Sequence, residues 1–199
     1  MNNFWENELL PGYYDDIVSR GIKKKRGIQA CWHILTYTKV ANFVEESSNH
    51  LDYACGPGTL IGQFTNGNSI GVDLSSKQIN YANQTYKSKG NFKTLENYSF
   101  EKNVNHFDIV TILGLFEYLN DDDILELLNN IYDSLKDNGK VIATTPNYGG
   151  IMFLIDKALN FLGPVDYNLE NINKFSKKRL IELIKKSKFS SYKVSKFNN

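Results

Sequence analysis

The hydrophobic pattern in the second half of the chain contains two continuous apolar runs with an amphipathic stretch between them. Residues 107–113, FDIVTIL, form the clearest run and predict a central parallel strand that is buried on both faces. Residues 140–145 form the second run, between an Asn138-Gly139 turn and Pro146. In residues 121–135, isoleucine and leucine recur on one helical face behind an acidic first turn. The pattern therefore predicts a strand, a helix and a second strand in succession.

The same alternation extends through the rest of the chain. Further strands are expected at residues 51–54, 70–74, 91–95 and 190–197. Helices are expected at residues 29–46, at 59–64, after Ser75 and Ser76 up to residue 86, and at 176–186 behind the cap Ser176. Residues 1–26 predict an irregular or partly helical arm, and the helix at 29–46 is expected to pack on the sheet. Together these elements predict an α/β fold with a doubly wound, mostly parallel sheet and helices on both faces.

The chain length of 199 residues is that of a single α/β domain. We expect four parts: an arm and helix over the site (1–46), a cofactor-binding core (47–147), a lid or substrate insert (148–174), and a last helix and strand (175–199). The apolar tract at residues 151–162 is shorter than the roughly 20 residues that a membrane span needs. It is interpreted as a lid, with peripheral contact to a lipid-linked acceptor as the alternative.

Charge and cysteine content narrow the possible functions. The chain has 23 Lys and Arg residues against 22 Asp and Glu, a net charge of +1, so nucleic-acid binding is not expected. The basic run at residues 23–26 is interpreted as a solvated face, with attraction of an anionic substrate as the alternative. Cys31 and Cys55 fit neither a disulfide framework nor a metal-ligand spacing. Because no signal-peptide pattern opens the chain, a cytoplasmic location is expected.

The stretch LDYACGPG at residues 51–58, followed by IGVDL at 70–74, predicts an adenosine-binding unit. Gly56 and Gly58 are expected to give a ligand close access to the backbone, and Asp73 to accept hydrogen bonds from a ribose diol. A dinucleotide loop would need glycine at Ile61 and backbone donors for a pyrophosphate, but Pro57 has no N–H. The loop is better suited to a cofactor without phosphates, namely S-adenosylmethionine.

The motifs, taken together, resemble those of class I S-adenosylmethionine-dependent methyltransferases, a Rossmann-like family, over about residues 13–189. The branch most resembled contains ubiquinone-type enzymes and small-molecule or glycan O-methyltransferases. The matching segments are GYYDDIV, LDYACGPGTLIGQF, GVDLSSKQINYA, FDIVTILGLFEYL, LKDNGKVIATTPN and GPVDYNLENINKFSKKRLIELIKKSKF. The family's final antiparallel hairpin is shortened here, with room for one strand only.

This resemblance implies a set of residues around the donor. The cofactor-binding residues that it implies are Tyr13, Tyr14, Asp52, Tyr53, Ala54, Cys55, Gly56, Gly58, Asp73, Leu74, Glu96, Asn97, Leu113, Gly114 and Phe116. Asp73 corresponds to the ribose-binding acid and Leu74 to the apolar contact with adenine. Ala54 is a departure, because the family usually has glycine there.

Methyl transfer needs an acceptor held in line with the donor methyl, and a base helps when the acceptor is a hydroxyl. His50 and His106 precede their strands, at the edge opposite the expected ligand, which leaves His33 as the candidate histidine. With Glu117 and Tyr118 it makes up the predicted catalytic set. Lesser candidates are Asn147, Tyr148 and Tyr167.

Some relatives of this branch carry metal ligands at four positions, which here are Gly114, Glu117, Tyr118 and Asn171. One carboxylate is too few for a hard divalent cation, so no catalytic metal is expected. The resemblance thus implies a metal-independent enzyme that methylates a hydroxyl, or an amine, of a small polar or glycan-type acceptor. The alternatives are a lipid or quinone-like acceptor, and a non-catalytic scaffold that binds S-adenosylmethionine or S-adenosylhomocysteine. A monomer or a homodimer is compatible with the sequence, because the missing strand leaves an open sheet edge.

Overall fold

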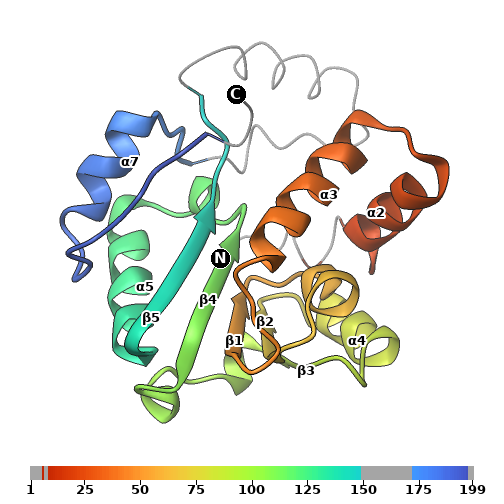
Figure 1. Ribbon diagram of the computed structural model, residues 1–199, viewed down its shortest axis with the longest axis horizontal. Coiled ribbons are helices and arrows are strands. Elements are labelled where there is room, and N and C mark those ends of the chain that lie inside the picture. Colours follow the sequence, from red (N-terminus) through yellow and green to blue (C-terminus); the bar gives the residue numbers. More distant parts are fainter. Residues whose placement is uncertain (1–5, 7–8, 149–171, 197–199) are drawn as a thin grey trace. The chain divides into compact units, whose positions relative to one another are not determined.

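The computed structural model describes residues 6, 9–148 and 172–196 (Figure 1). The chain divides into two compact units. The first comprises Met1–Ile112 and Ser134–Ile142, and the second comprises Leu113–Asp133 and Ala143–Asn199. None of the predicted segment boundaries coincides with a boundary of these units, and the single-domain organisation stays a prediction.

The centre of the fold is a five-stranded sheet in the order β3-β2-β1-β4-β5. Its strands are β1 (Asn49–Tyr53), β2 (Asn68–Asp73), β3 (Asn91–Thr94), β4 (Phe107–Leu113) and β5 (Leu135–Thr144). β1 pairs in parallel with both β2 and β4, and β2 pairs in parallel with β3. Leu51, Val72 and Val110 are fully buried, as continuous apolar strands in a covered sheet should be. The predicted Rossmann-like α/β fold is confirmed.

Helices precede, connect and follow these strands along the chain. They are α2 (Tyr13–Lys24), α3 (Ile28–Ala41), α4 (Ser76–Thr85), α5 (Asp121–Ser134) and α7 (Lys177–Ile184), with a π-helical turn η1 at Leu60–Phe64 and 3-10 turns η2, η3 and η4 at Leu95–Asn97, Glu101–Asn103 and Phe116–Tyr118. Of the three predicted serine caps, Ser75 and Ser176 are confirmed, since Ser75 Oγ accepts from the backbone N–H of Gln78 and Ser176 Oγ from that of Arg179, whereas Ser76 is the first residue of α4. A side-chain cap of this kind satisfies one of the free N–H groups at a helix start.

Helix α3 differs from its prediction in length and in the face that it buries. It ends at Ala41 rather than near residue 46. Its large apolar residues Trp32 and Leu35 are exposed rather than packed on the sheet, and so is Phe43, which the prediction included in the helix. The reason is a close approach of α2 on the other side, where a Cβ on Gly21 would overlap the Cβ of Ala30. Small residues therefore decided which face of α3 is buried.

The predicted last strand is wrong for the residues that can be tested. Residues 190–196 belong to no strand, and Phe197 lies outside the described residues. Tyr192 is exposed, and Lys196 stands where the next apolar residue of the alternation would fall. Alternation alone cannot make a strand without a neighbouring strand to complete its hydrogen bonds.

Strand β5 begins earlier than expected, at Leu135 rather than at residue 140. The backbone is irregular at the predicted turn, because Asn138 takes the left-handed conformation with φ of 66° inside the strand. Asparagine tolerates this conformation better than most residues do.

Candidate donor and acceptor sites

The turn after β1 alternates between ordinary and left-handed residues: Ala54, Gly56 and Gly58 have φ of 62°, 54° and 76°. The two glycines serve different purposes. A Cβ on Gly56 would meet no atom within 4 Å, so this glycine opens onto free space. A Cβ on Gly58 would lie 2.6 Å from the ring of Phe92. Gly56 therefore leaves open space beside the loop backbone, whereas the absence of a side chain at Gly58 makes room for Phe92.

Ala54 is strained in this turn, because a left-handed conformation costs an L-residue roughly 1–2 kcal/mol. Replacing it by glycine should raise the free energy of unfolding by about 0.5–1 kcal/mol, after the greater entropy of glycine in the unfolded chain is subtracted. Urea denaturation of Ala54→Gly tests this. The matched control is Ala41→Gly at the end of α3, where the same exchange should destabilise the protein. Equal losses in the two variants would contradict the strain at Ala54.

Asp73, at the end of β2, fixes the glycine loop. Its Oδ2 accepts from the backbone N–H of Gly56 at 2.8 Å, and its Oδ1 accepts from the backbone N–H of Ser75 at 2.8 Å. Burial raises the pKa of this carboxyl. Each oxygen keeps a second lone pair, so the group can still accept from a ribose diol. The residue predicted to read the ribose thus also shapes the loop that carries Gly56.

Asp52 lies in a chain of buried polar groups across three strands. Thr111 Oγ1 donates to Asp52 Oδ1 at 2.6 Å, His50 Nε2 lies 2.8 Å from Thr111 Oγ1, and His50 Nδ1 lies 2.9 Å from Ser69 Oγ. Burial raises the pKa of Asp52 to about 7, with a further contribution from the charge of Asp73. Burial lowers the pKa of His50 to about 4, so its ring is neutral.

Sequence reasoning missed this chain, because it placed His50 at the far edge of the sheet. The available signal was polar residues inside otherwise apolar strands. The register pairs them directly: His50 lies opposite Ser69, and Asp52 lies opposite Thr111. Polar groups buried in a sheet need partners, and these residues supply them to each other.

Helices α2 and α3 carry an aromatic cluster with His33 at its centre. The ring of His33 lies 5.3 Å from that of Tyr14, 4.9 Å from Trp32 and 5.9 Å from Tyr37. Tyr13 in turn packs edge-on against Tyr14 at 5.2 Å. Burial lowers the pKa of His33 to about 4. A neutral imidazole of such low basicity is a poor general base near neutral pH.

Asp15 on α2 holds this helix to the core of the first unit, a role that no sequence pattern predicts. Its carboxylate accepts from the hydroxyls of Tyr81 and Tyr86, at 2.8 and 2.7 Å, and from Gln63 Nε2 at 2.7 Å. Tyr81 belongs to α4 and Gln63 to η1. The predicted aromatics Tyr13 and Tyr14 therefore stand on a helix that is held at several points.

In the second unit, Glu117 is buried in the turn η4. Its Oε2 accepts from Thr145 Oγ1 at 3.1 Å, and its backbone carbonyl accepts from the backbone N–H of Asn173 at 2.9 Å. Burial raises the pKa of Glu117 to about 7. Gly114 has φ of 67°, and a Cβ there would lie 3.5 Å from Glu117 Oε1, an ordinary contact. A carboxyl with this pKa can take up or release a proton near neutral pH.

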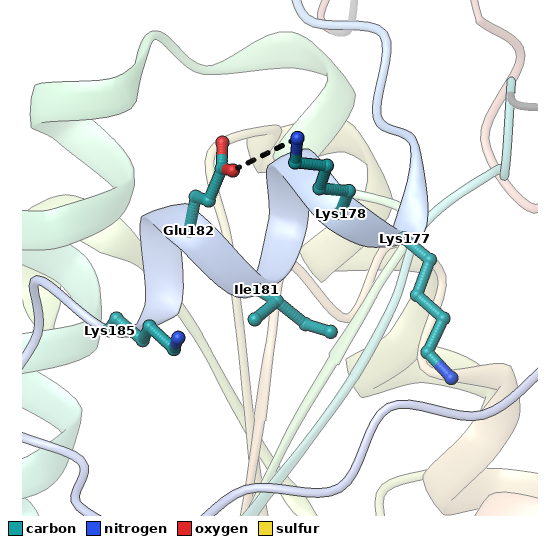
Figure 2. Close-up of a pocket in the computed structure, with 5 residues that line it drawn as sticks. All are labelled: Lys177, Lys178, Ile181, Glu182 and Lys185. Atoms are coloured by element: carbon teal, nitrogen blue, oxygen red, sulfur yellow. Dashed lines mark ion pairs between the residues drawn. The ribbon is translucent and has the colours of Figure 1, made fainter.

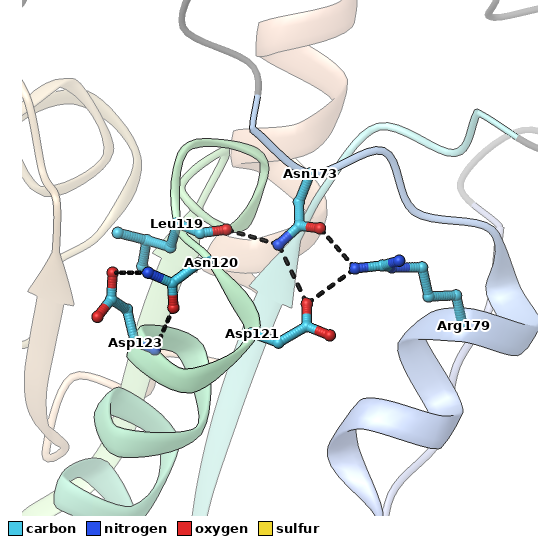
Figure 3. Close-up of polar contacts among 6 residues, drawn as sticks. All are labelled: Leu119, Asn120, Asp121, Asp123, Asn173 and Arg179. Carbon is cyan, nitrogen blue, oxygen red and sulfur yellow. Dashed lines mark hydrogen bonds and ion pairs between the residues drawn. The ribbon is translucent and has the colours of Figure 1, made fainter.

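Figure 3 shows the contacts that hold the segment after Glu117 in place. Asn173 Nδ2 donates to the carbonyl oxygen of Leu119 at 2.6 Å and to Asp121 Oδ1 at 3.2 Å. Arg179 Nη2 donates to Asp121 Oδ1 at 2.9 Å and to Asn173 Oδ1 at 2.6 Å. Sequence reasoning missed Asn173 and Arg179, because a single asparagine and a helix-surface arginine carry no pattern.

The remaining predicted donor residues vary in exposure. Leu74 is 42% exposed, as an adenine contact could be, and Glu96 and Asn97 are exposed on η2. Tyr53 stacks on Phe100 with 5.6 Å between ring centroids. Burial raises the pKa of the Cys55 thiol well above its usual range. Phe116 is a buried core residue, and Leu113 is partly buried at the end of β4.

The predicted acceptor-side residues fall partly outside the described residues. Tyr118 is partly buried in η4, and its backbone N–H donates to the carbonyl of Leu115. Asn147 forms an isolated parallel bridge with Phe175, and the backbone N–H of Tyr148 donates to the carbonyl of Phe175 at 2.8 Å. Tyr167, Asn171 and the predicted lid at 151–162 lie outside the described residues.

A hollow on α7 does not belong to either site. It is lined by Lys177, Lys178, Ile181 and Glu182 of this helix and by Lys185, the residue that caps its C-terminus (Figure 2). Lys178 and Glu182 form a weak, exposed ion pair at 4.0 Å. We assign the hollow no function.

Two searches of the described residues bear on metals and membranes. Residues 6, 9–148 and 172–196 contain no group of three or more His, Cys, Asp or Glu side chains placed to hold a metal ion. In the same part of the chain, none of the helices is both long enough and apolar enough to span a bilayer.

Comparison with known proteins gives a sequence match for the core of the chain. Residues 51–139 match the family model described as a methyltransferase domain. Comparison with curated protein sequences gives no significant match.

Solved structures show the same fold. A S-adenosylmethionine-dependent methyltransferase from Archaeoglobus fulgidus is 17% identical, with a TM-score of 0.57 over 87% of this chain and 67% of that one. Phosphoethanolamine N-methyltransferase 2 from Haemonchus contortus, solved with phosphomonomethylethanolamine and S-adenosylhomocysteine, is 20% identical, with a TM-score of 0.59 over 81% and 38%. Geranyl diphosphate C-methyltransferase from Streptomyces coelicolor, solved with Mg²⁺, geranyl diphosphate and S-adenosylhomocysteine, is 12% identical, with a TM-score of 0.59 over 89% and 65%.

The matched segment begins at Leu51, in the strand that leads into the glycine loop, and it includes Asp73 and Glu117. The open side of Gly56 and the buried carboxyls of Asp52 and Asp73 fit a cofactor that is cationic and carries no phosphate. Residues 51–139 thus resemble a methyltransferase domain in sequence, and the chain has the fold found in S-adenosylmethionine-dependent methyltransferases.

Proposed function

We propose that the protein moves a methyl group to a hydroxyl of a small polar or glycan-type acceptor, with Glu117 as the general base and without a metal. The observation that supports this most is the buried Glu117 carboxyl, whose pKa is raised to about 7. A base is most effective when its pKa lies near the working pH. His33, whose pKa is lowered to about 4, is the weaker candidate for the same role.

On the donor side, S-adenosylmethionine would supply an activated methyl on a positively charged sulfur. Gly56 leaves room for the amino-acid end, Asp73 accepts hydrogen bonds from the ribose hydroxyls, and Asp52 with Asp73 favours the positive charge. The hydrogen bond from the Gly56 backbone N–H to Asp73 Oδ2 holds the turn after β1 against the end of β2. Holding donor and acceptor in line supplies most of the catalysis expected of such a site.

On the acceptor side, Glu117 accepts the proton that the hydroxyl loses. Its ionised carboxylate takes the hydroxyl proton while the oxygen lone pair forms the new bond to the methyl carbon and the carbon–sulfur bond breaks toward sulfur. Thr145 Oγ1 donates to Glu117 Oε2, which favours the ionised form that can accept the proton. An amine acceptor would need the same base only if it arrives protonated.

The test is methyl transfer from labelled S-adenosylmethionine to panels of hydroxyl, amine and lipid or quinone-like acceptors, in chelator-treated buffer. Labelled product from a polar hydroxyl acceptor supports the proposal. Product from an amine or a lipid only would replace the acceptor class, and turnover that returns only with added magnesium would refute metal independence. Tight cofactor binding without turnover on any panel would favour a scaffold. The proposal also includes a cytoplasmic location and a monomer or homodimer.

The affinity for S-adenosylmethionine should rise with pH. Because the pKa of Asp52 in the free protein is raised to about 7, this carboxyl is neutral at lower pH, and a bound cation favours its ionised form. Binding should therefore strengthen by up to about tenfold per unit below pH 7 and level off above it. Calorimetry across this range, with proton release read from buffers of different ionisation heat, measures the effect.

Two controls show whether the pH dependence of binding comes from Asp52 or from titration of the ligand itself. Asp52→Asn keeps an acceptor for Thr111 but should flatten the pH dependence. S-adenosylhomocysteine has the same amino-acid end without the sulfonium charge, so its affinity should change less with pH. An unchanged slope in Asp52→Asn would assign the titration to another group.

A further inference from the structure

The segment that contains most of α2 and all of α3 is strongly basic, although the whole protein is nearly neutral. Residues 17–44 contain no acidic residue and six basic ones, while the rest of the chain has 17 basic and 22 acidic residues. Residues 23–26, KKKR, lie at the end of α2 and in the turn before α3, and all four are exposed. The first unit therefore presents a concentrated positive charge at this turn.

The helix that follows the turn exposes an apolar face. Ile28, Trp32 and Leu35 are 89%, 43% and 51% exposed. Their spacing of four and three residues places them on one side of α3, opposite the buried Ala30 and Val40. We call the exposed residues 23–26 together with Ile28, Trp32 and Leu35 the arm surface. Large exposed apolar side chains in a row indicate a contact surface.

We propose that the arm surface docks the protein on an anionic lipid bilayer. Apolar side chains of a helix can enter the boundary between headgroups and acyl chains, and tryptophan is favoured at that depth. Lysine and arginine beside them are attracted to anionic headgroups. The arm surface combines both features within one turn and one helix. This inference does not depend on the acceptor proposed above.

The chemistry of the surface favours lipid over two other partners. A nucleic acid would use the positive charge but would leave three large apolar side chains without a role. In a two-fold dimer the same patch meets itself, so residues 23–26 of both copies would approach each other and repel. An anionic bilayer satisfies both the charge and the apolar face.

Binding to vesicles tests the proposal. Trp5→Phe leaves Trp32 as the one tryptophan of the chain, so its fluorescence reports on the arm surface. With vesicles of phosphatidylcholine and phosphatidylserine, the emission should shift to the blue and the protein should co-sediment. With phosphatidylcholine alone, or in high salt, binding should be much weaker. No shift and no co-sedimentation with the anionic vesicles would overturn the proposal.

Charge-matched variants locate the binding. The triple variant Lys23→Gln, Lys24→Gln, Arg26→Gln should weaken partition into anionic vesicles on the order of 100-fold, at about a fivefold loss per basic residue. The control removes equal charge from α7 and its C-cap, at Lys177, Lys178 and Lys185 (Figure 2), and should leave partition within a few-fold of the unmodified protein. An equal loss in the control would show a general charge effect and contradict the arm surface.

A variant of the apolar residues distinguishes binding to lipid from binding to nucleic acid and from self-association. Ile28→Ser with Leu35→Ser changes exposed residues only, so the fold should survive, as circular dichroism can verify. Vesicle partition should fall at least tenfold. Tighter binding to RNA or DNA than to vesicles, unaffected by this variant, would overturn the proposal in favour of nucleic acid. A dimer in sedimentation that this variant dissociates would overturn it in favour of self-association.

Discussion

Replacing Gly56 by alanine is expected to abolish detectable binding of S-adenosylmethionine while leaving most of the stability intact. The added methyl meets no protein atom within 4 Å, so the cost to folding is limited to the left-handed φ of 54°, about 1–2 kcal/mol. The same methyl would occupy the space through which a ligand reaches the loop backbone. Calorimetry gives the binding and urea denaturation gives the stability.

Gly58→Ala is the matched control two residues away. It has the same kind of left-handed φ, but its methyl would lie 2.6 Å from the ring of Phe92 in the core. This overpacking should add about 1–3 kcal/mol to the conformational cost, so the variant should lose stability first. If both variants lose the same stability, or if Gly56→Ala binds the cofactor normally, the assignment of open space at Gly56 is wrong.

The sequence predicted those parts of the fold that local patterns determine. The apolar run at 107–113 is strand β4 with the same bounds, and Ser75 and Ser176 cap helices as expected. The glycine loop and the acid at the end of β2 were identifiable for the same reason. Glycines at short spacing after a predicted strand, and an acidic residue at the end of the next strand, are local sequence patterns.

Contacts between distant residues account for what the sequence could not predict. The buried face of α3 depends on how closely Gly21 approaches Ala30, which spacing along one helix does not reveal. The roles of Gly56 and Gly58 differ because Phe92, more than 30 residues further along the chain, lies beside only one of them. The partners of Asp52 come from neighbouring strands, so they became visible only with the register.

Glu117→Gln is expected to lower the rate constant kcat by about 10²–10⁴-fold, the usual contribution of a general base. The amide keeps the size of the side chain and an oxygen that can accept from Thr145 Oγ1, so the segment held by Asn173 should stay in place. Burial raises the pKa of Glu117 in the folded state, which means that its ionised form opposes folding at neutral pH. The variant should therefore be no less stable there, and its binding of S-adenosylmethionine should be unchanged.

The pH profile distinguishes a base from a residue that only positions the acceptor. In the unmodified enzyme, kcat/KM for the acceptor, measured at saturating S-adenosylmethionine, should rise about tenfold per unit below pH 7 and level off above it, because only ionised Glu117 accepts the proton. Glu117→Gln should lose this rise. Thr145→Val removes a hydrogen bond that favours the ionised form, so the rise should move to higher pH. His33→Gln should leave the profile in place, and a profile that moves with His33 rather than with Thr145 would identify the histidine as the base.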